Sequence, residues 1–277
     1  MSIAVRNSLK AVVRALGFCA AAALVLVLAS IAAKNFAAFR EEIVVGAVGV
    51  ALTFALTAIF LRCERRGFSD VGLAWRRGTL AHFGIGCALG GALLALHVAA
   101  MSMSGKVSWT RNESVDASGM VAAAVGYLLL ALREEMAFRA YPLRTLLPAL
   151  GAVGAQGIVF AVFVLEHRLG GASWINAIFG AGLGALVFGM AALATRGIAL
   201  PFGMHVAWNF GDWLRGGKGN QGGWVMHVDE AHTTYIEIFG LATYAVIMLL
   251  ALTALIVLYR RADTARHPHS RGMSKSA

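Results

Sequence analysis

The sequence predicts an all-α fold, namely a polytopic membrane protein with a bundle of about eight transmembrane helices and an intramembrane active site. Its composition supports this class, because 59% of the 277 residues are hydrophobic and only 14% are charged. Apolar runs of about 18 residues or more recur along the chain, and runs of that length span a bilayer. Two adjacent acidic residues at the end of one such run predict a functional site inside the membrane.

The first predicted span follows the basic residues Arg6, Lys10 and Arg14. It covers 17–33, which is long for a cleaved signal peptide, so the sequence favours a retained first helix. The other predicted spans cover 43–61, 80–101, 119 onward, 152–167, 175–195, 198–214 and 235–259. The fourth span is expected to continue as an amphipathic extension until Pro142 and Pro148 end it.

The distribution of Lys and Arg predicts the orientation. With eight spans, 17 of the 24 Lys and Arg residues lie on the side of both termini. Because positively charged loops stay in the cytoplasm, both termini are expected to be cytoplasmic. The Ala-, Gly- and Arg-rich composition is typical of a bacterial inner (cell) membrane protein. We expect helices one to three in 1–118, a catalytic core of helices four to seven in 119–214, and a loop, the last helix and a basic, disordered tail in 215–277.

The basic charge is not interpreted as a nucleic-acid signal. The net charge is +10, but the basic residues flank apolar runs and do not cluster with aromatic residues. The three cysteines show no C-x-x-C spacing, so the sequence indicates neither a disulfide framework nor a thiolate metal site. The expected surroundings are the lipid bilayer.

Glu134 and Glu135 stand at the end of the apolar run 120–132. A charged side chain at bilayer depth costs about 2.5–3.5 kcal/mol on insertion scales, so an acidic pair there is a functional-site hypothesis. Glu135 and Arg139 are four residues apart and share a helix face, whereas Glu134 is turned about 100° away. Without a local partner, Glu134 is suited to act as a general base or acid. Arg133 and Arg139, taken singly, are as readily explained by snorkelling to the interface.

Three further polar side chains lie in later apolar spans. His167 ends the fifth span, and His205 and Asn209 are four residues apart in the seventh, so they point the same way. The sequence midpoint of Glu134 and His167 falls at the turn near residue 150, so the two can lie level across an antiparallel helix pair. A single intramembrane histidine usually packs and forms a hydrogen bond between helices. One glutamate, two histidines and one asparagine on three helices favour a shared site instead.

Together these residues have the chemistry of peptide hydrolysis, which needs an activated water and donors for the developing oxyanion. Glu134 can take the proton of the water, while His167 holds that water by a hydrogen bond or through a metal. His205 and Asn209 can donate to the tetrahedral intermediate. A zinc ion bound by Glu134, His167 and His205 is one alternative, and the absence of any cofactor is the other. H-E-x-x-H, G-x-S-x-G and nucleotide-binding patterns are absent.

Three motifs in this order resemble the CPBP family, namely Glu134-Glu135-x-x-x-Arg139, Phe163-x-x-x-His167 and His205-x-x-x-Asn209. This family comprises the type II CAAX prenyl endopeptidases and bacterial relatives, including bacteriocin-immunity and lysostaphin-resistance-like proteins. The resemblance covers residues 119–214 and implies an eight-helix intramembrane bundle. It also implies roles: Glu134 with His167 activates water, His205 with Asn209 stabilises the oxyanion, and Glu135 with Arg139 gives support. Both metal-dependent and glutamate-dependent mechanisms are argued for the family.

The leading hypothesis is an intramembrane endopeptidase that cuts a membrane-attached peptide or a lipidated protein near the cytoplasmic face. Prenylated CAAX proteins are the substrates that the family name implies. In a bacterium, peptide pheromone or bacteriocin-related processing, or membrane-protein quality control, is expected instead. The alternative is a non-catalytic membrane immunity or scaffold protein with the same fold. Glu166, which departs from the family pattern, faces about 100° away from His167 and is interpreted as a lipid-interface residue rather than a metal ligand.

Overall fold

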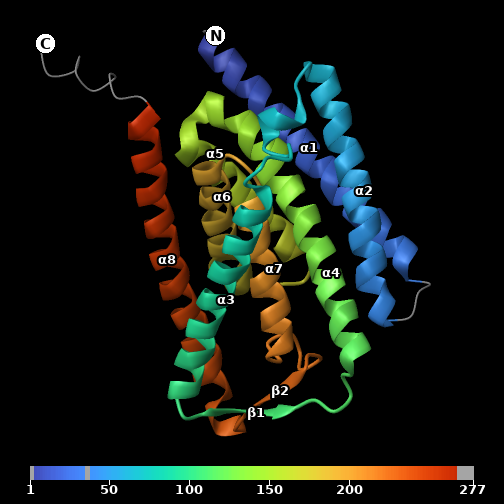
Figure 1. The fold of residues 1–277 in the computed structure, drawn as a ribbon, viewed down its shortest axis with the longest axis vertical. Coiled ribbons are helices and arrows are strands. Elements are labelled where there is room, and N and C mark those ends of the chain that lie inside the picture. The colour runs from blue at the N-terminus through green and yellow to red at the C-terminus, as the bar shows by residue number, and fades with distance from the viewer. Residues whose placement is uncertain (1–2, 35–37, 267–277) are drawn as a thin grey trace, which may run out of the picture.

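The computed structural model describes residues 3–34 and 38–266, so the predicted disordered tail from residue 267 onward lies outside the described residues. Figure 1 shows long, roughly parallel and antiparallel helices that form one bundle. The α-helices are α1 (Ile3–Ala33), α2 (Ala38–Glu64), α3 (Thr79–Met103), α4 (Ala117–Glu135), α5 (Tyr141–Leu169), α6 (Leu183–Thr195), α7 (Ala199–Leu214) and α8 (Thr233–Arg266). The shorter elements are the 3-10 helices η1 (Phe68–Val71) and η4 (Glu230–His232), the π-helical turns η2 (Met136–Ala140) and η3 (Asn176–Gly182), and the strands β1 (Val107–Arg111) and β2 (Trp224–Val228).

The predicted all-α, polytopic membrane fold is confirmed, but the predicted count of about eight spans is wrong. Six stretches of the described chain are long and apolar enough to cross a bilayer, and the longest reverses direction, which gives six or seven crossings. They are Val5–Ala33, Glu41–Glu64, Thr79–Met103, Ala117–Leu169, Asn176–Thr195 and Glu230–Arg261. Two features explain the difference. Helix α7 has only 16 residues, or about 24 Å at about 1.5 Å per residue, which is shorter than the roughly 30 Å of hydrocarbon. Residues 117–169 form one apolar stretch of 53 residues, in which two predicted spans merge.

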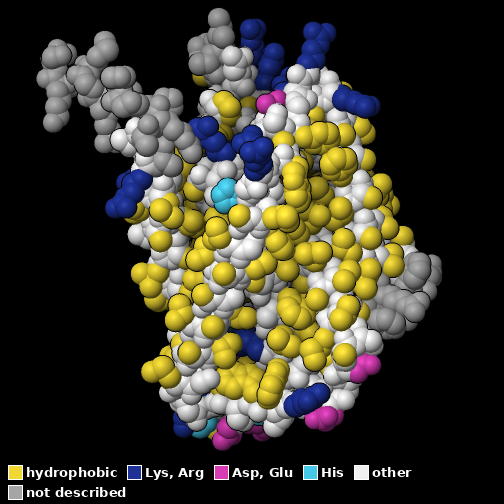
Figure 2. Space-filling view, viewed as in Figure 1, with side chains coloured by type: hydrophobic (Ala, Val, Ile, Leu, Met, Phe, Trp, Pro, Cys, Tyr) yellow, Lys and Arg dark blue, Asp and Glu magenta, His cyan; other side chains and the backbone are white. Residues whose placement is uncertain are grey.

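The outer surface of the bundle is apolar, as an integral multi-pass membrane protein requires. Large side chains such as Leu24, Val121 and Leu250 are 59%, 64% and 67% exposed, and a water-soluble protein would bury them. Figure 2 shows hydrophobic side chains over most of the visible face, with Lys and Arg gathered at the end where the chain begins. Helix α8 also runs toward that end (Figure 1). The start of α1 and the end of α8 therefore lie on one side of the bundle.

The stretch 117–169 reverses direction at Gly151, which has the left-handed φ of 68° that favours glycine. On either side of this reversal the chain packs against itself, and the rings of Phe138 and Phe163 meet edge to face with centroids 4.9 Å apart. The predicted turn near residue 150 is therefore confirmed. The predicted end of the helix at the prolines is wrong, because Pro142 lies in the first turn of α5 and Pro148 lies inside it.

Helix α7 is held against α3 by contacts between backbones. An added Cβ would lie 2.2 Å from Leu200 O at Gly86, and 2.1 Å from Phe83 O at Gly203. Because no side chain fits at either position, the glycines let the two helices cross closely, as small residues do in membrane bundles. This crossing fixes α7, the helix that carries His205.

A two-stranded antiparallel sheet covers the end of the bundle opposite the start of α1 (Figure 1). Strand β1 pairs with β2 from Val107 opposite Val228 to Arg111 opposite Trp224. The sequence predicted only loops in these two regions. The β-branched and aromatic residues in each strand are the signal that could have predicted them.

Candidate active site

Glu134 and Glu135 lie in the last turn of α4, directly before the π-helical turn η2. Helix α4 begins at the N-cap Asp116, whose carboxylate accepts a hydrogen bond from the N–H of Gly119 at 2.8 Å. The two acids differ in their exposure. The Glu135 side chain is completely buried, whereas 21% of the Glu134 side chain is exposed. Only Glu134 can therefore meet a water or a substrate directly.

Glu135 joins α4 to α7 through a buried network. Its Oε1 atom lies 2.8 Å from Nδ1 of His205 and 3.3 Å from Nη1 of Arg139. The predicted common face of Glu135 and Arg139 is thereby confirmed. A carboxylate on one ring nitrogen of a histidine fixes the ring orientation and the nitrogen that carries the proton. Glu135 therefore acts on His205, and it is too buried to act on a substrate.

Arg139 is fully buried, which excludes the snorkelling interpretation. Its guanidinium carbon lies 4.7 Å from the ring centroid of Phe163, 5.6 Å from that of Phe188 and 5.8 Å from that of Phe138. Aromatic faces attract a desolvated cation, so these rings take the place of water around the charge. Aromatic rings from η2, α5 and α6 thus hold Arg139 in place beside Glu135.

His205 presents one nitrogen to each glutamate. With Nδ1 on Glu135, its Nε2 lies 3.6 Å from Oε2 of Glu134. That separation exceeds a direct hydrogen bond, and no group in the described part of the chain forms a hydrogen bond with the buried Oε2 of Glu134. The imidazole stacks on Phe188 with centroids 4.6 Å apart, which holds the ring plane. The predicted meeting of Glu134 and His205 across two helices is confirmed.

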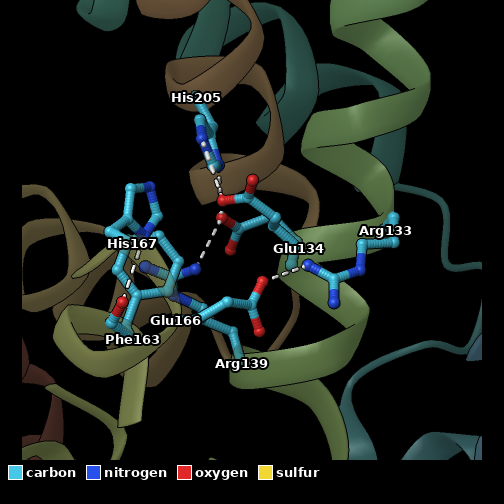
Figure 3. A network of polar contacts seen from close by, with 8 residues as sticks. Arg133, Glu134, Arg139, Phe163, Glu166, His167 and His205 are labelled. Carbon is cyan, nitrogen blue, oxygen red and sulfur yellow. Dashed lines mark hydrogen bonds and ion pairs between the residues drawn. The ribbon is translucent and has the colours of Figure 1, made fainter. Parts of the chain in front are cut away.

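His167 reaches the same region from α5. Its Nδ1 lies 3.0 Å from the carbonyl oxygen of Phe163, one turn earlier, and its ring packs on the Phe163 ring at 4.4 Å. The carbonyl can only accept, so Nδ1 carries a proton, and in the neutral tautomer Nε2 is the acceptor. Figure 3 shows His167 and His205 on two sides of the Glu134 carboxylate.

Asn209 lies one turn beyond His205 on α7, on the same helix face. It is half buried. Among the residues that the structure describes, no hydrogen-bond partner meets its side chain. The role of Asn209 as an oxyanion donor stays a prediction.

Arg133 and Glu166 form an ion pair that the sequence did not predict. Nη1 of Arg133 lies 2.6 Å from Oε1 of Glu166, and the two side chains are 1% and 17% exposed. The interpretation of Glu166 as a lipid-interface residue is therefore wrong, and Arg133 does not snorkel. The signal was present in the sequence, because Arg133 and Glu166 directly precede Glu134 and His167, which the sequence predicts to lie level across the same turn.

The side chains do not fit a zinc site. Within residues 3–34 and 38–266, no group of three His, Cys, Asp or Glu side chains gathers so that it could hold a metal ion. The predicted zinc set of Glu134, His167 and His205 therefore lacks the close convergence that a tetrahedral site needs.

Residues 116–211 match the family model described as type II CAAX prenyl endopeptidase Rce1-like. This segment contains every residue of the three motifs, and it agrees with the resemblance found in residues 119–214. No curated protein and no solved structure matches the chain.

Proposed function

We propose that this protein is an intramembrane endopeptidase that hydrolyses a peptide bond of a membrane-attached peptide or a lipidated protein. The observation that carries the proposal is the position of Oε2 of Glu134. Among the described residues this atom accepts no hydrogen bond, and it lies 3.6 Å from the Nε2 of a histidine whose other nitrogen is held by Glu135. A general base must be within reach of its proton, directly or through one water. The match of residues 116–211 supports the same reaction class.

In the proposed reaction, Glu134 takes a proton from a water that Nε2 of His167 also holds. The resulting hydroxide attacks the carbonyl carbon of the scissile bond, and the carbonyl oxygen becomes an oxyanion. Nε2 of His205, when it carries a proton, and the amide of Asn209 donate to that oxyanion. When the C–N bond breaks, Glu134 returns the proton to the leaving amine, so the base is regenerated.

Burial of the supporting network argues for catalysis over the immunity or scaffold alternative. Desolvating charges is costly, and apolar side chains of similar volume often pack as stably as a buried ion pair. Here Glu135, Arg139 and His205 are all buried and lie around Glu134, whose side chain is only partly exposed. A scaffold has no need of that arrangement.

The proposed orientation places the start of α1 and the end of α8 in the cytoplasm of a bacterial cell. The Lys and Arg residues at that end of the bundle support it (Figure 2). Substrates would then be cut toward the cytoplasmic side of the membrane. A prenylated C-a-a-X peptide is one substrate class, and an unprenylated membrane peptide such as a pheromone or bacteriocin precursor is the other.

The test compares wild type with Glu134→Gln in lipid nanodiscs. The reporters are an internally quenched C-a-a-X peptide with a farnesylated cysteine and the same peptide without farnesyl, and mass spectrometry of native membranes covers unknown substrates. Wild type should cleave at least one peptide, and Glu134→Gln should abolish cleavage without a change in thermal unfolding. The matched control is Glu113→Gln, because Glu113 is 84% exposed in a loop. A cellular phenotype that survives Glu134→Gln would favour the scaffold.

A further inference from the structure

The ion pair between Arg133 and Glu166 lies at the level of the candidate catalytic residues (Figure 3). Each partner directly precedes a residue that we propose to hold the attacking water. Glu134 follows Arg133, and His167 follows Glu166. Among the described residues, this is the ion pair that links the end of α4 to α5. Its position suggests more than a general contribution to packing.

Arg133 is enclosed by several helices. Its Nη2 donates to the carbonyl oxygen of Ala22 on α1 at 3.1 Å. On α2, Gly49 leaves room for the side chain, because a Cβ there would lie 3.3 Å from Cγ of Arg133. The ring centroid of Phe138 lies 6.0 Å from its guanidinium carbon. The guanidinium is therefore held in one position, and its ion pair with Glu166 holds the end of α5 relative to it.

We propose that Arg133 and Glu166 are positioning residues that set the separation of Glu134 and His167 in the proposed peptide hydrolysis. The inference rests on the proposed function. The end of α5 is joined to α4 only through the distant reversal at Gly151. Side-chain contacts must therefore fix the position of the end of α5 along the axis of α4. A slip of one residue moves a helix by about 1.5 Å, and a misplacement of about 1 Å can cost about 10²-fold in rate.

The competing explanation is that the pair only stabilises the bundle. Removing one partner of a buried pair leaves an uncompensated charge, whereas replacing both partners by uncharged side chains is often neutral or stabilising. Comparing Glu166→Gln with the double variant Arg133→Met/Glu166→Gln therefore separates the two explanations. Arg133→Lys is the conservative variant, since it keeps the charge opposite Glu166.

The experiment measures kcat, KM and thermal unfolding in nanodiscs with whichever quenched reporter peptide wild type cleaves. Glu166→Gln should lower kcat by about 10²-fold with KM within about twofold. The double variant should regain the unfolding temperature of wild type but keep the low kcat. Arg133→Lys should keep kcat within about tenfold of wild type. A double variant that regains kcat, or a Glu166→Gln variant with normal kcat, would overturn the proposal.

The control breaks an equally short ion pair elsewhere. Arg215 and Asp212 lie 2.6 Å apart at the far end of α7, with side chains 15% and 17% exposed. Asp212→Asn should lower the unfolding temperature and leave kcat unchanged, because this pair is local to one helix end. If wild type cleaves no peptide at all, the proposed function fails and the positioning role fails with it. A change that spares kcat in active protein refutes only the positioning role.

Discussion

Replacing Glu135 by Gln removes a buried charge and nearly keeps the side-chain shape. The lost contacts are those to His205 at 2.8 Å and to Arg139 at 3.3 Å. Breaking a buried ion pair by removing one partner costs about 3–5 kcal/mol, because the other charge is left uncompensated. Arg139 keeps the rings of Phe138, Phe163 and Phe188 around it, so we expect the low end, a loss of about 3 kcal/mol in the free energy of unfolding.

The same substitution should lower kcat by at least about 10²-fold. An amide can present either its oxygen or its NH₂ group to Nδ1 of His205, so it no longer determines which ring nitrogen carries the proton. Replacing the orienting carboxylate of the serine protease triad lowers kcat by about 10⁴-fold. Replacing the hydrogen-bond partner of a metal-bound histidine lowers metal affinity or activity by about 10–100-fold. Equilibrium unfolding in mixed micelles and reporter cleavage measure the two effects. A stability within about 1 kcal/mol of wild type together with an unchanged kcat would refute this role for Glu135.

Three further predictions test the helix crossing, the oxyanion donor and the start of α4. Gly203→Ala should destabilise the protein by about 1–3 kcal/mol or more through overpacking against α3, whereas Gly91→Ala, with open space at its Cβ, should be neutral or slightly stabilising in the same unfolding assay. Asn209→Ala should lower kcat by about 10²–10³-fold with little change in unfolding, and an unchanged kcat would remove Asn209 from the site. Hydrogen bonds from Gly119 N–H and Ser118 lower the pKa of Asp116 below its usual value. The contribution of this cap is therefore complete above the usual Asp pKa and is lost as pH falls through the lowered value, so hydrogen exchange at Gly119 should accelerate there in wild type but not in Asp116→Ala.

The sequence predicted the pairing of residues across the site because that pairing depends on periodicity and symmetry. Glu135 and Arg139 share a face at helical spacing, and His167 and Glu134 lie on either side of one reversal. Both relations follow from a straight helix and one turn. The neighbours Arg133 and Glu166 obey the same symmetry. The angle between Glu166 and His167 on one helix does not show that Arg133 lies opposite on α4, so it does not predict the ion pair.

The span count could not be derived from hydropathy alone. Helix α7 is apolar but short, and its place depends on the close backbone contacts of Gly86 and Gly203 with neighbouring helices, which a single sequence does not display. The roles of Pro142 and Pro148 were also misjudged. Proline at the first turn of a helix lacks only a hydrogen bond that would be unsatisfied anyway, so Pro142 starts α5 instead of ending α4.

The π-helical turn at Met136–Ala140 makes the chain between Glu135 and Gly151 sensitive to length. Deleting one residue there would swing every later side chain about 100° around the helix axis. Arg139 would then lose its contacts with the rings of Phe163 and Phe188, and the part of α5 after Gly151 would meet α4 on a different face. Homologues and engineered chimaeras should therefore tolerate insertions around β1 and β2, at the opposite end of the molecule, and keep this five-residue segment at constant length.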